Sequence, residues 1–325
     1  MKTTGINEGV NGSAATAGPL PVRDMVVAAR RTMVGRRRDI EVVAAALAAG
    51  RSVLLEGPPG TGKTTLLRSL AAGAGVTLHL VEGNAELSPA RLVGHHDPSR
   101  ILSEGYRTDN FVPGPLVDAM TSGGLLYVEE LNRVPEETLN VLLGVLSERR
   151  MQVPRVGEVV ADPRFRMVAA MNPFDAVGTG RISPAIYDRS CRVAVDYQDE
   201  AEERAIVTTS AEGREALVAR AVSAVRRTRH HPDLRMGSSV RGAIDIVAVA
   251  GALAELRNEA APTGAGSVGL DAALTSLSGR VTLREGSSRT VEDILMEIWA
   301  ATAPSDEAEA TEGKARGPGA GAART

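Results

Sequence analysis

The sequence is poor in aromatic residues and has a single cysteine. Phenylalanine, tyrosine and tryptophan make up 2% of the 325 residues, so alanine, valine and leucine must fill the core. Cys191 has no partner for an internal disulfide, which favours a reducing compartment. The longest apolar run, from Ala243, carries Asp245 and is too short to span a bilayer, and the polar start does not resemble a signal peptide. These absences predict a soluble, cytoplasmic protein without a membrane partner.

An excess of charge of one sign is also lacking. The net charge is −3 and the isoelectric point is about 6.0, which gives no overall electrostatic reason to expect binding to nucleic acid. A basic groove on one face is still compatible with these values. An apolar content of 43% lets a chain of this length bury a sizeable core, in one domain with a smaller companion.

Apolar strands and helices alternate through the first part of the chain. Helices are predicted at residues 63–75 and 135–150, the second with Pro135 in its first turn. Strands separated by helices predict a parallel sheet covered on both faces, with ligands beyond the carboxyl ends of the strands. The predicted strands are residues 51–57, 76–83, 123–130, 165–172 and 191–197. The predicted fold class is therefore α/β.

The strand pattern stops near Asp199, and mostly helical segments follow. One helix begins near Ser238 and Ser239, which are available as caps, and residues 279–286 are predicted to form a small pair of strands. The two ends of the chain are rich in small residues and lack a periodic apolar face, so they are predicted to be disordered. The predicted divisions are a tail at 1–20, an α/β domain at 21–199, a helical domain at 200–302 and a tail at 303–325.

A glycine-rich turn joins the first predicted strand to a helix. It fits the pattern G-x-x-x-x-G-K-[ST], in which successive backbone N–H groups converge on the β-phosphate of a nucleotide. Lys63 would reach the β- and γ-phosphates and the Thr64 hydroxyl would ligate Mg²⁺, while Gly60 and Gly62 would let the backbone approach the phosphate. The alternative is a glycine-rich turn with no ligand. The predicted nucleotide-binding residues of the turn are Gly57, Pro58, Pro59, Gly60, Thr61, Gly62, Lys63, Thr64 and Thr65.

Two further predicted strands end in polar side chains. Glu129 and Glu130 follow one strand, and in nucleotide hydrolases the first acid of such a pair holds Mg²⁺ while the second activates the attacking water. Asn172 follows another strand, where its amide could orient that water. The first acid is usually aspartate, so the longer side chain of Glu129 points to slower turnover. Solvated acids and a plain Asn-Pro turn are the alternatives without catalysis.

With these motifs in this order, the chain resembles the AAA+ ATPases and, within them, the MoxR family, over residues 33–299. The stretch "GHHDPSRILSEGYRTDNFVPGPLVDAM" resembles the family's insert, a hairpin followed by the "PGPL" turn. The stretch "RRMQVPRVGEVVADPRFRMVAAMNP" resembles the hairpin that precedes its sensor asparagine. The resemblance implies an AAA+ P-loop NTPase αβα sandwich with a parallel sheet, followed by a smaller, mostly helical lid domain. It also implies ATP as the bound nucleotide, with Mg²⁺.

The resemblance assigns further roles to single residues. Val34 and Gly35, in "MVGR", correspond to a segment that contacts the nucleotide. Arg189, in "YDRS", corresponds to an arginine finger that acts on the γ-phosphate of a neighbouring subunit, and Arg241 corresponds to the lid arginine that senses the γ-phosphate. A finger that acts in trans implies a ring homo-oligomer, expected to be a hexamer. Two nearby arginines are alternatives for the finger: Arg181 and Arg192.

The resemblance also implies a task in the cell. MoxR-type ATPases commonly act with von Willebrand factor A (VWA) domain proteins to remodel or activate protein complexes. We therefore expect ATP hydrolysis in a chaperone-like role, with a VWA-domain partner and a protein client, and with the insert near residues 94–108 as a candidate contact surface. Two alternatives stay open: a nucleic-acid motor, and an ATP-gated assembly factor that turns over little because of Glu129.

Two further patterns have ordinary interpretations. His95, His96 and Asp97 lack a further ligand at metal-binding spacing, so a solvated hairpin is favoured over a metal site. The run "RRTRHH" at residues 226–231 could bind phosphate groups, but a cationic helix end is the favoured interpretation.

Overall fold

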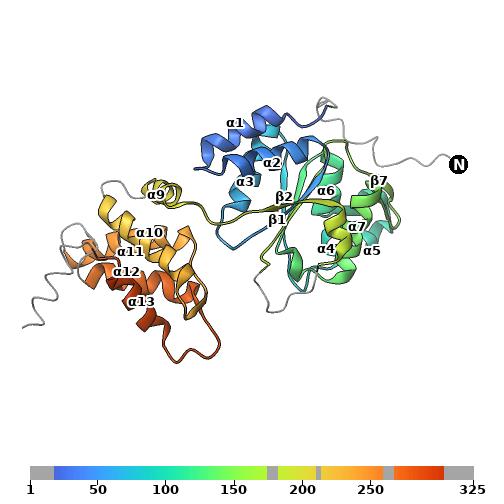
Figure 1. Cartoon of the computed structure of the whole chain (residues 1–325). Helices are drawn as coiled ribbons and strands as arrows, with labels where there is room; N and C mark the ends of the chain where they lie inside the picture. The colour runs from blue at the N-terminus through green and yellow to red at the C-terminus, as the bar shows by residue number, and fades with distance from the viewer. Residues whose placement is uncertain (1–17, 174–181, 210–213, 259–266, 304–325) are drawn as a thin grey trace, which may run out of the picture. The chain divides into compact units, whose positions relative to one another are not determined.

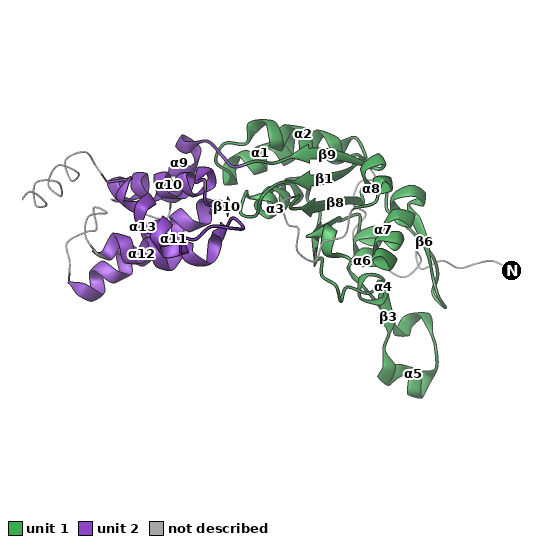
Figure 2. Ribbon diagram, turned by 60° about the horizontal axis from the view of Figure 1, so that its bottom comes forward, with its two compact units in different colours: residues 1–196 green, residues 197–325 purple. Residues whose placement is uncertain are grey.

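A computed structural model describes residues 18–173, 182–209, 214–258 and 267–303 (Figure 1). The chain divides into two compact units, residues 1–196 and 197–325 (Figure 2). The division falls between Asp196 and Tyr197, a few residues before the boundary expected near Asp199. Each unit has its own apolar core, so the two are described one at a time.

Unit 1 is built on a parallel sheet of five strands. The strand order is β2-β5-β8-β1-β9, and every neighbouring pair runs parallel. The predicted α/β class and all five predicted strands are therefore confirmed. The strands are β1 (Ser52–Glu56), β2 (Leu78–Glu82), β5 (Leu125–Glu129), β8 (Arg166–Met171) and β9 (Ser190–Ala194).

Helices cover both faces of this sheet because residues along each strand alternate between two apolar cores (Figure 1). Leu55 and Tyr127 belong to the core formed with α1, α2 and α3, whereas Leu54 and Val128 belong to the core formed with α4, α6 and α7. The first group is α1 (Val22–Thr32), α2 (Arg37–Ala48) and α3 (Lys63–Ala74). The second group is α4 (Pro89–Val93), α6 (Pro115–Ser122) and α7 (Glu136–Glu148), with Pro135 at the N-cap of α7 rather than inside its first turn.

Two antiparallel hairpins are added to unit 1. The insert hairpin predicted near residues 94–108 is present: β3 (Gly94–His96) pairs with β4 (Phe111–Pro113), and α5 (Pro98–Glu104) and a 3₁₀ turn at Thr108–Asn110 lie between them. Inside it the ring of His96 contacts the edges of Tyr106 and Phe111, with centroids 5.4 and 5.3 Å apart. The second hairpin, β6 (Arg150–Val153) with β7 (Gly157–Val160), precedes β8 as predicted. The last elements of unit 1 are α8 (Pro184–Asp188) and β9.

Unit 2 is mostly helical, with an apolar core shared by its helices. The prediction of a strand pair within residues 279–286 is wrong in one respect, because only β11 lies there and its antiparallel partner is β10, next to the end of α10. Ser239 occupies the N-cap position of α11, but its side chain makes no capping hydrogen bond. The elements are α9 (Glu200–Thr208), α10 (Glu215–His230), β10 (Leu234–Met236), α11 (Val240–Arg257), α12 (Ser267–Leu277), β11 (Thr282–Leu283) and α13 (Val291–Ala300).

Among the described residues, no helix combines the length and the apolar character that crossing a lipid bilayer requires.

Candidate nucleotide-binding site

The predicted phosphate-binding, metal-binding and water-orienting residues of unit 1 meet at one edge of the sheet. Glu56, the last residue of β1, is level with Met171 at the end of β8, and Val128 of β5 is level with Ala169 of β8. Parallel strands end on the same side, so the residues that follow them lie along one line. The register therefore brings together the glycine-rich turn, the acid pair and the asparagine, which are far apart in the sequence.

The glycine-rich turn adopts the backbone of a phosphate-binding loop. Gly60 and Gly62 have φ angles of 73° and 84°, in the left-handed region that favours glycine, and α3 starts directly after them. The buried Lys63 ammonium donates to the carbonyl oxygens of Gly57 and Pro58 at 2.9 and 2.8 Å. The Thr61 hydroxyl also donates to Pro58, at 3.0 Å. The loop thus closes around the lysine at the positive end of α3, where a phosphate is favoured.

Gly57 is required for a reason that the sequence pattern does not contain. A Cβ added there would lie 1.8 Å from the carbonyl oxygen of Val195, in the chain that leaves β9. The backbone of that chain is fixed to β1, because the Val195 N–H donates to the Glu56 carbonyl at 2.7 Å. The turn is therefore packed against the end of β9 as well as shaped for a ligand.

The oxygen atoms beside the loop fit a magnesium ion. The Thr64 hydroxyl donates to a carboxylate oxygen of Glu129 at 3.3 Å. Hydroxyl and carboxylate oxygens are the hard ligands that Mg²⁺ takes at phosphate sites. The longer side chain of Glu129 thus reaches the first turn of α3, and the two residues predicted as metal ligands lie together.

A tyrosine that the sequence analysis did not identify lies at the same place. Tyr127 precedes Glu129 by two residues, so both side chains leave the same face of β5. The ring is fully buried, and its hydroxyl lies close enough to Thr64 and Glu129 to interact with both, although it forms no well-aligned hydrogen bond within the described part of the chain. Burial raises the pKa of the Tyr127 phenol well above its ordinary value, and the charge of Glu129 acts in the same direction. This hydroxyl is therefore neutral at physiological pH.

Glu130 lies next to the metal-binding residues in a strained backbone conformation. Its φ is 52°, which is unusual for a residue with a side chain, and its carboxylate pairs with Arg133 at 3.0 Å, both side chains being 41% exposed. Gly83 supports this corner: its N–H donates to the Glu129 carbonyl at 2.8 Å, and an added Cβ would lie 2.4 Å from the Glu130 carbonyl oxygen. Asn172 directly follows β8 and is half-buried, next to the Met171 carbonyl that accepts from Gly57 N–H.

The predicted entry segment lies between α1 and α2. Val34 and Gly35 form this connection, and the Met33 methyl group is close enough to Gly62 that a Cβ added there would lie 3.5 Å from it. The segment therefore runs against the phosphate-binding loop, where its predicted contact with the nucleotide would be made.

The arginines predicted as fingers lie in different surroundings. Arg192 is held within its own unit by the buried carboxylate of Glu56, which also accepts from the Tyr187 hydroxyl at 2.8 Å. Burial raises the pKa of Tyr187, and its hydrogen bond to Glu56 acts in the same direction. Arg181 lies outside the described residues.

Arg189 lies at the opposite edge of the sheet from the loop. It immediately precedes Ser190, which is level with Ser52 at the start of β1, so a strand length separates it from Gly57. Its Nε donates to the Ser147 hydroxyl of α7 at 2.7 Å, and its side chain is 38% exposed. It is thus directed to the surface rather than to the phosphate loop of its own chain. Arg241 is an exposed residue in the first turn of α11 in unit 2, and its sensing role stays a prediction.

Three contacting residues escaped the sequence analysis for different reasons. Arg133 follows Glu130 by three residues, a spacing that predicts contact on a helical turn, so its ion pair was within reach of sequence reasoning. The position of Tyr127 beside Glu129 follows from the two-residue period of a strand. Gly83 follows β2 and approaches the Glu130 carbonyl, after β5, so closely that no side chain fits. This contact between the ends of two strands has no signal in the sequence.

Known proteins match the same region. Residues 52–190 match the AAA domain of the dynein-related subfamily. An uncharacterized protein of Bacillus subtilis, YojN, is 36% identical over 181 residues, which are 55% of this chain and 59% of that protein. An uncharacterized protein of Staphylococcus haemolyticus is 36% identical over 151 residues, 46% of this chain and 57% of that protein. The chain thus spans somewhat more than half the length of these curated relatives.

Solved structures with a similar arrangement include a candidate ATPase of Cytophaga hutchinsonii, with a TM-score of 0.49 and 20% identity, covering 87% of this chain and 94% of that one. A RuvB mutant of Thermotoga maritima has a TM-score of 0.49 and 16% identity, covering 83% of this chain and 71% of that one. Likeness at this level does not distinguish one function from another. The part of the chain that carries the phosphate loop, the acid pair and the asparagine is thus similar to an AAA domain.

Proposed function

We propose that this chain is a MoxR-type AAA+ ATPase that hydrolyses ATP to ADP and phosphate in a ring of identical subunits. The observation that carries the proposal is the contact between Thr64 and Glu129 beside the buried ammonium of Lys63. A hydroxyl, a carboxylate and a lysine at the start of a helix are the groups that a nucleotide triphosphate with its metal requires.

The residues of the edge divide the chemical work. Thr64 and Glu129 are the residues that would hold Mg²⁺, and the bound ion would supply neutralisation of the phosphate charge. Lys63 would exchange its contacts with the loop carbonyls for phosphate oxygens. Glu130 would take a proton from water, and for this it has to share or leave its ion pair with Arg133. Asn172 would orient that water.

Phosphate release in Mg²⁺-ATP tests the activity. We expect the wild-type chain to hydrolyse ATP and the Lys63→Ala chain to be inactive, because the variant lacks the cation for the β- and γ-phosphates. Arg91→Ala, at an exposed arginine of α4, is the control and is expected to keep wild-type activity. A wild-type chain that binds Mg²⁺-ATP and releases no phosphate contradicts the proposal.

We further propose that the ring is a hexamer and that Arg189 is lent to the next subunit. This is supported by its position at the edge opposite its own phosphate loop and by its partial exposure. Subunits with Lys63→Ala and subunits with Arg189→Ala should each be inactive and should regain part of the activity when mixed, since each supplies what the other lacks. Mixing that restores nothing, although the wild-type chain is active and oligomeric, counts against a finger in trans.

We propose a VWA-domain protein as partner and a protein complex as client, with the insert as contact surface. The support within unit 1 is a set of exposed apolar side chains on the insert: Leu102 is 91% exposed, and Tyr106 and Val112 are also exposed. In Figure 2 the insert, with α5, projects from the rest of unit 1. A VWA-domain protein encoded beside this chain should be captured by the Glu130→Gln variant in ATP. Leu102→Asp should abolish capture, whereas Leu256→Asp, at a site 79% exposed in unit 2, should not.

One observation favours a second candidate, an assembly factor that is gated by ATP binding and hydrolyses ATP very slowly. It is the presence of Glu129 where aspartate is usual. Glu129→Asp separates the two: a large rise in turnover supports the gated factor, and an unchanged rate supports the ATPase.

A nucleic-acid motor has less support, because Arg226 and Arg229 of the basic run both pair with Glu203. DNA-stimulated, salt-dependent hydrolysis would favour it.

A further inference from the structure

The chain passes from unit 1 to unit 2 at Asp196 and Tyr197, and an arginine holds each side of this joint. On the unit 1 side, the buried Arg36 donates from Nη2 to the Asp196 carbonyl at 2.6 Å and from Nη1 to Asp39 at 2.9 Å. Arg36 directly follows Val34 and Gly35, the segment predicted to contact the nucleotide. The end of unit 1 is therefore fixed to the entry segment.

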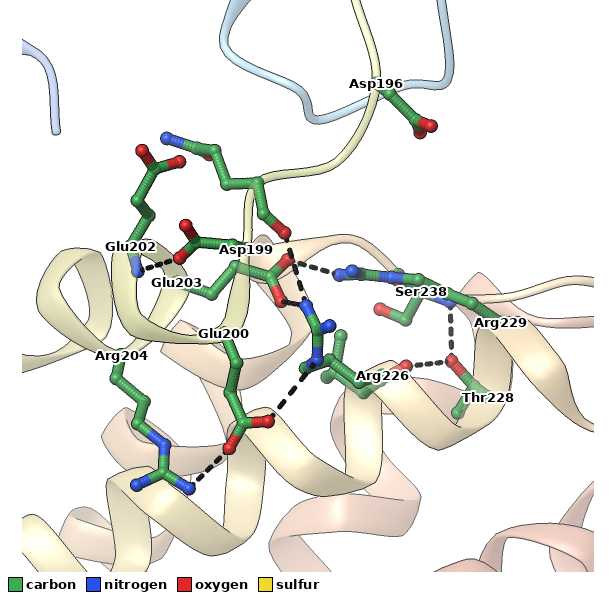
Figure 3. A network of polar contacts seen from close by, with 12 residues as sticks. Asp196, Asp199, Glu200, Glu202, Glu203, Arg204, Arg226, Thr228, Arg229 and Ser238 are labelled. Atoms are coloured by element: carbon green, nitrogen blue, oxygen red, sulfur yellow. Dashed lines mark hydrogen bonds and ion pairs between the residues drawn. The ribbon is translucent and has the colours of Figure 1, made fainter. Parts of the chain in front are cut away.

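On the unit 2 side, Arg229 contacts three separate segments. Its guanidinium lies 3.9 Å from the ring centroid of Tyr197, its Nη2 donates to Glu203 at 2.6 Å, and its Nε donates to the Ser238 carbonyl at 2.8 Å. Figure 3 shows Arg229 between Glu203 of α9 and Ser238. One planar, multidentate group thus joins the first residue of unit 2, the first helix and the loop before α11.

A second arginine and a threonine complete the arrangement (Figure 3). The Glu203 side chain is only 2% exposed, and Arg226 donates to it at 3.0 Å and to the Gln198 carbonyl at 3.2 Å. The Ser238 N–H donates to the Thr228 hydroxyl at 2.9 Å, so both backbone groups of Ser238 are bound. The helix α11 starts two residues after Ser238, and its second residue is Arg241.

We infer that Arg229 is a positioning residue that makes the joint and the first turn of α11 move as one body. A buried carboxylate shared by two arginines is expensive to separate, so the contacts of Arg229 are kept when the joint moves. Within unit 2, Arg229 thus ties the position of Tyr197 to that of Ser238 and of Arg241. The inference rests on the proposed function, because its kinetic test uses the sensing role expected for Arg241.

The alternative is that the buried cluster only stabilises unit 2, and a double-mutant cycle separates the two. Tyr197→Leu removes the ring under Arg229 and leaves the Glu203 and Ser238 contacts in place. We expect it to lower kcat about 5-fold or more, the size of an ordinary coupling between sites. In the Arg241→Ala chain the same change should lower kcat by less than about 2-fold, since the arginine that it would displace is absent. Equal fold-losses in both chains overturn the inference.

Hydrogen exchange supplies a readout that needs no hydrolysis. Arg229→Lys keeps the charge beside Glu203, but an ammonium cannot also reach Ser238 and cover Tyr197. Amide exchange should become faster both at residues 197–203 and at 237–241. The control is Arg204→Gln, which removes an arginine that pairs with Glu200 at 2.5 Å and contacts neither the joint nor Ser238. Exchange at 237–241 that is unchanged in Arg229→Lys overturns the inference, even if the chain proves not to hydrolyse ATP, a result that refutes the proposed function by itself.

Discussion

The acid pair that ends β5 in unit 1 and Glu203 of unit 2 have opposite surroundings. In unit 1, Glu129 and Glu130 follow a strand at a half-exposed edge, with Thr64 at 3.3 Å and a partly exposed Arg133 as partners. In unit 2, Glu203 is enclosed between two arginines and is almost completely removed from solvent. The first arrangement leaves carboxylate oxygens available to a ligand, and the second leaves none.

This difference separates a binding site from a structural cluster that contains the same residue types. A buried carboxylate is tolerated only when charges and hydrogen bonds satisfy it, and such a group has no capacity left for a substrate. A carboxylate at a strand end with weak, exposed partners can exchange them for a metal or a water molecule. The comparison therefore predicts that substitutions at the two sites have opposite effects on stability and on activity.

Glu203→Ala is expected to have the largest effect. It removes the buried carboxylate that Arg226 and Arg229 share and leaves Arg226 only the partly exposed Glu200 at 3.8 Å, and breaking a buried pair in this way costs about 3–5 kcal/mol. The only tryptophan, Trp299, lies in the core of unit 2, so its fluorescence during urea unfolding reports this unit alone. The control is Glu200→Ala, at a side chain 48% exposed, which should change the unfolding free energy by about 0.5 kcal/mol or less. A loss below about 1 kcal/mol in Glu203→Ala would remove the contrast between the units.

Glu130→Gln is expected to show the reverse behaviour. Loss of a general base should lower turnover by about 10²- to 10⁴-fold. The ion pair with Arg133 is partly exposed, so the stability of unit 1 should change by no more than about 1 kcal/mol. Phosphate release and far-UV circular dichroism melting measure the two quantities on the same sample. If stability falls while turnover persists, Glu130 is a structural acid and the assignment of the site fails.

Much of unit 1 could be predicted because its information is local. The strands ending at Glu56, Glu129 and Met171 are short apolar runs followed by polar residues, and the turn before Lys63 has a fixed spacing of glycines. Parallel strands then bring these endings to one edge without further knowledge. Once the parallel sheet is predicted, Thr64 and Glu129 are expected to lie close to each other.

The features that could not be predicted from the sequence depend on contacts between residues that are far apart along the chain. Arg36 and Asp196 are 160 positions apart, and the pattern around Arg36 resembles any basic helix start. The run at residues 226–231 is a cationic helix end, as predicted, because α10 ends there with Arg227, Arg229 and His230 in its last turn, but nothing local indicates that Glu203 lies against it. In the same way, the sequence predicts a strand pair within residues 279–286, whereas β11 pairs with β10, which lies more than 40 positions earlier in the chain.

Gly83→Ala should have an intermediate effect, confined to the site edge. The added Cβ would lie 2.4 and 2.7 Å from the carbonyl oxygens of Glu130 and Glu129, and backbone atoms cannot turn away. We expect a loss of about 1–3 kcal/mol in unit 1, together with weaker Mg²⁺-dependent nucleotide binding. The matched control is Gly144→Ala, which lies inside α7 with no atom within 4 Å of the added Cβ. That change should stabilise unit 1 by about 0.5–1 kcal/mol, so circular dichroism melting should shift in opposite directions.

Tyr127→Phe is expected to have the smallest effect, and the sign of its change in stability is informative. Removing a buried hydroxyl that makes a well-aligned hydrogen bond usually destabilises a protein, but the Tyr127 hydroxyl, beside Thr64 and Glu129, makes none within the described residues. Tyr127→Phe should therefore leave the stability of unit 1 unchanged or raise it by about 1 kcal/mol. If the hydroxyl serves the metal-binding pair beside it, the same variant should bind Mg²⁺ with ADP more weakly, which titration calorimetry can measure. A clear loss of stability with unchanged metal binding would mean that Tyr127 is a structural residue like Glu203, and the two units would then differ less than their burial suggests.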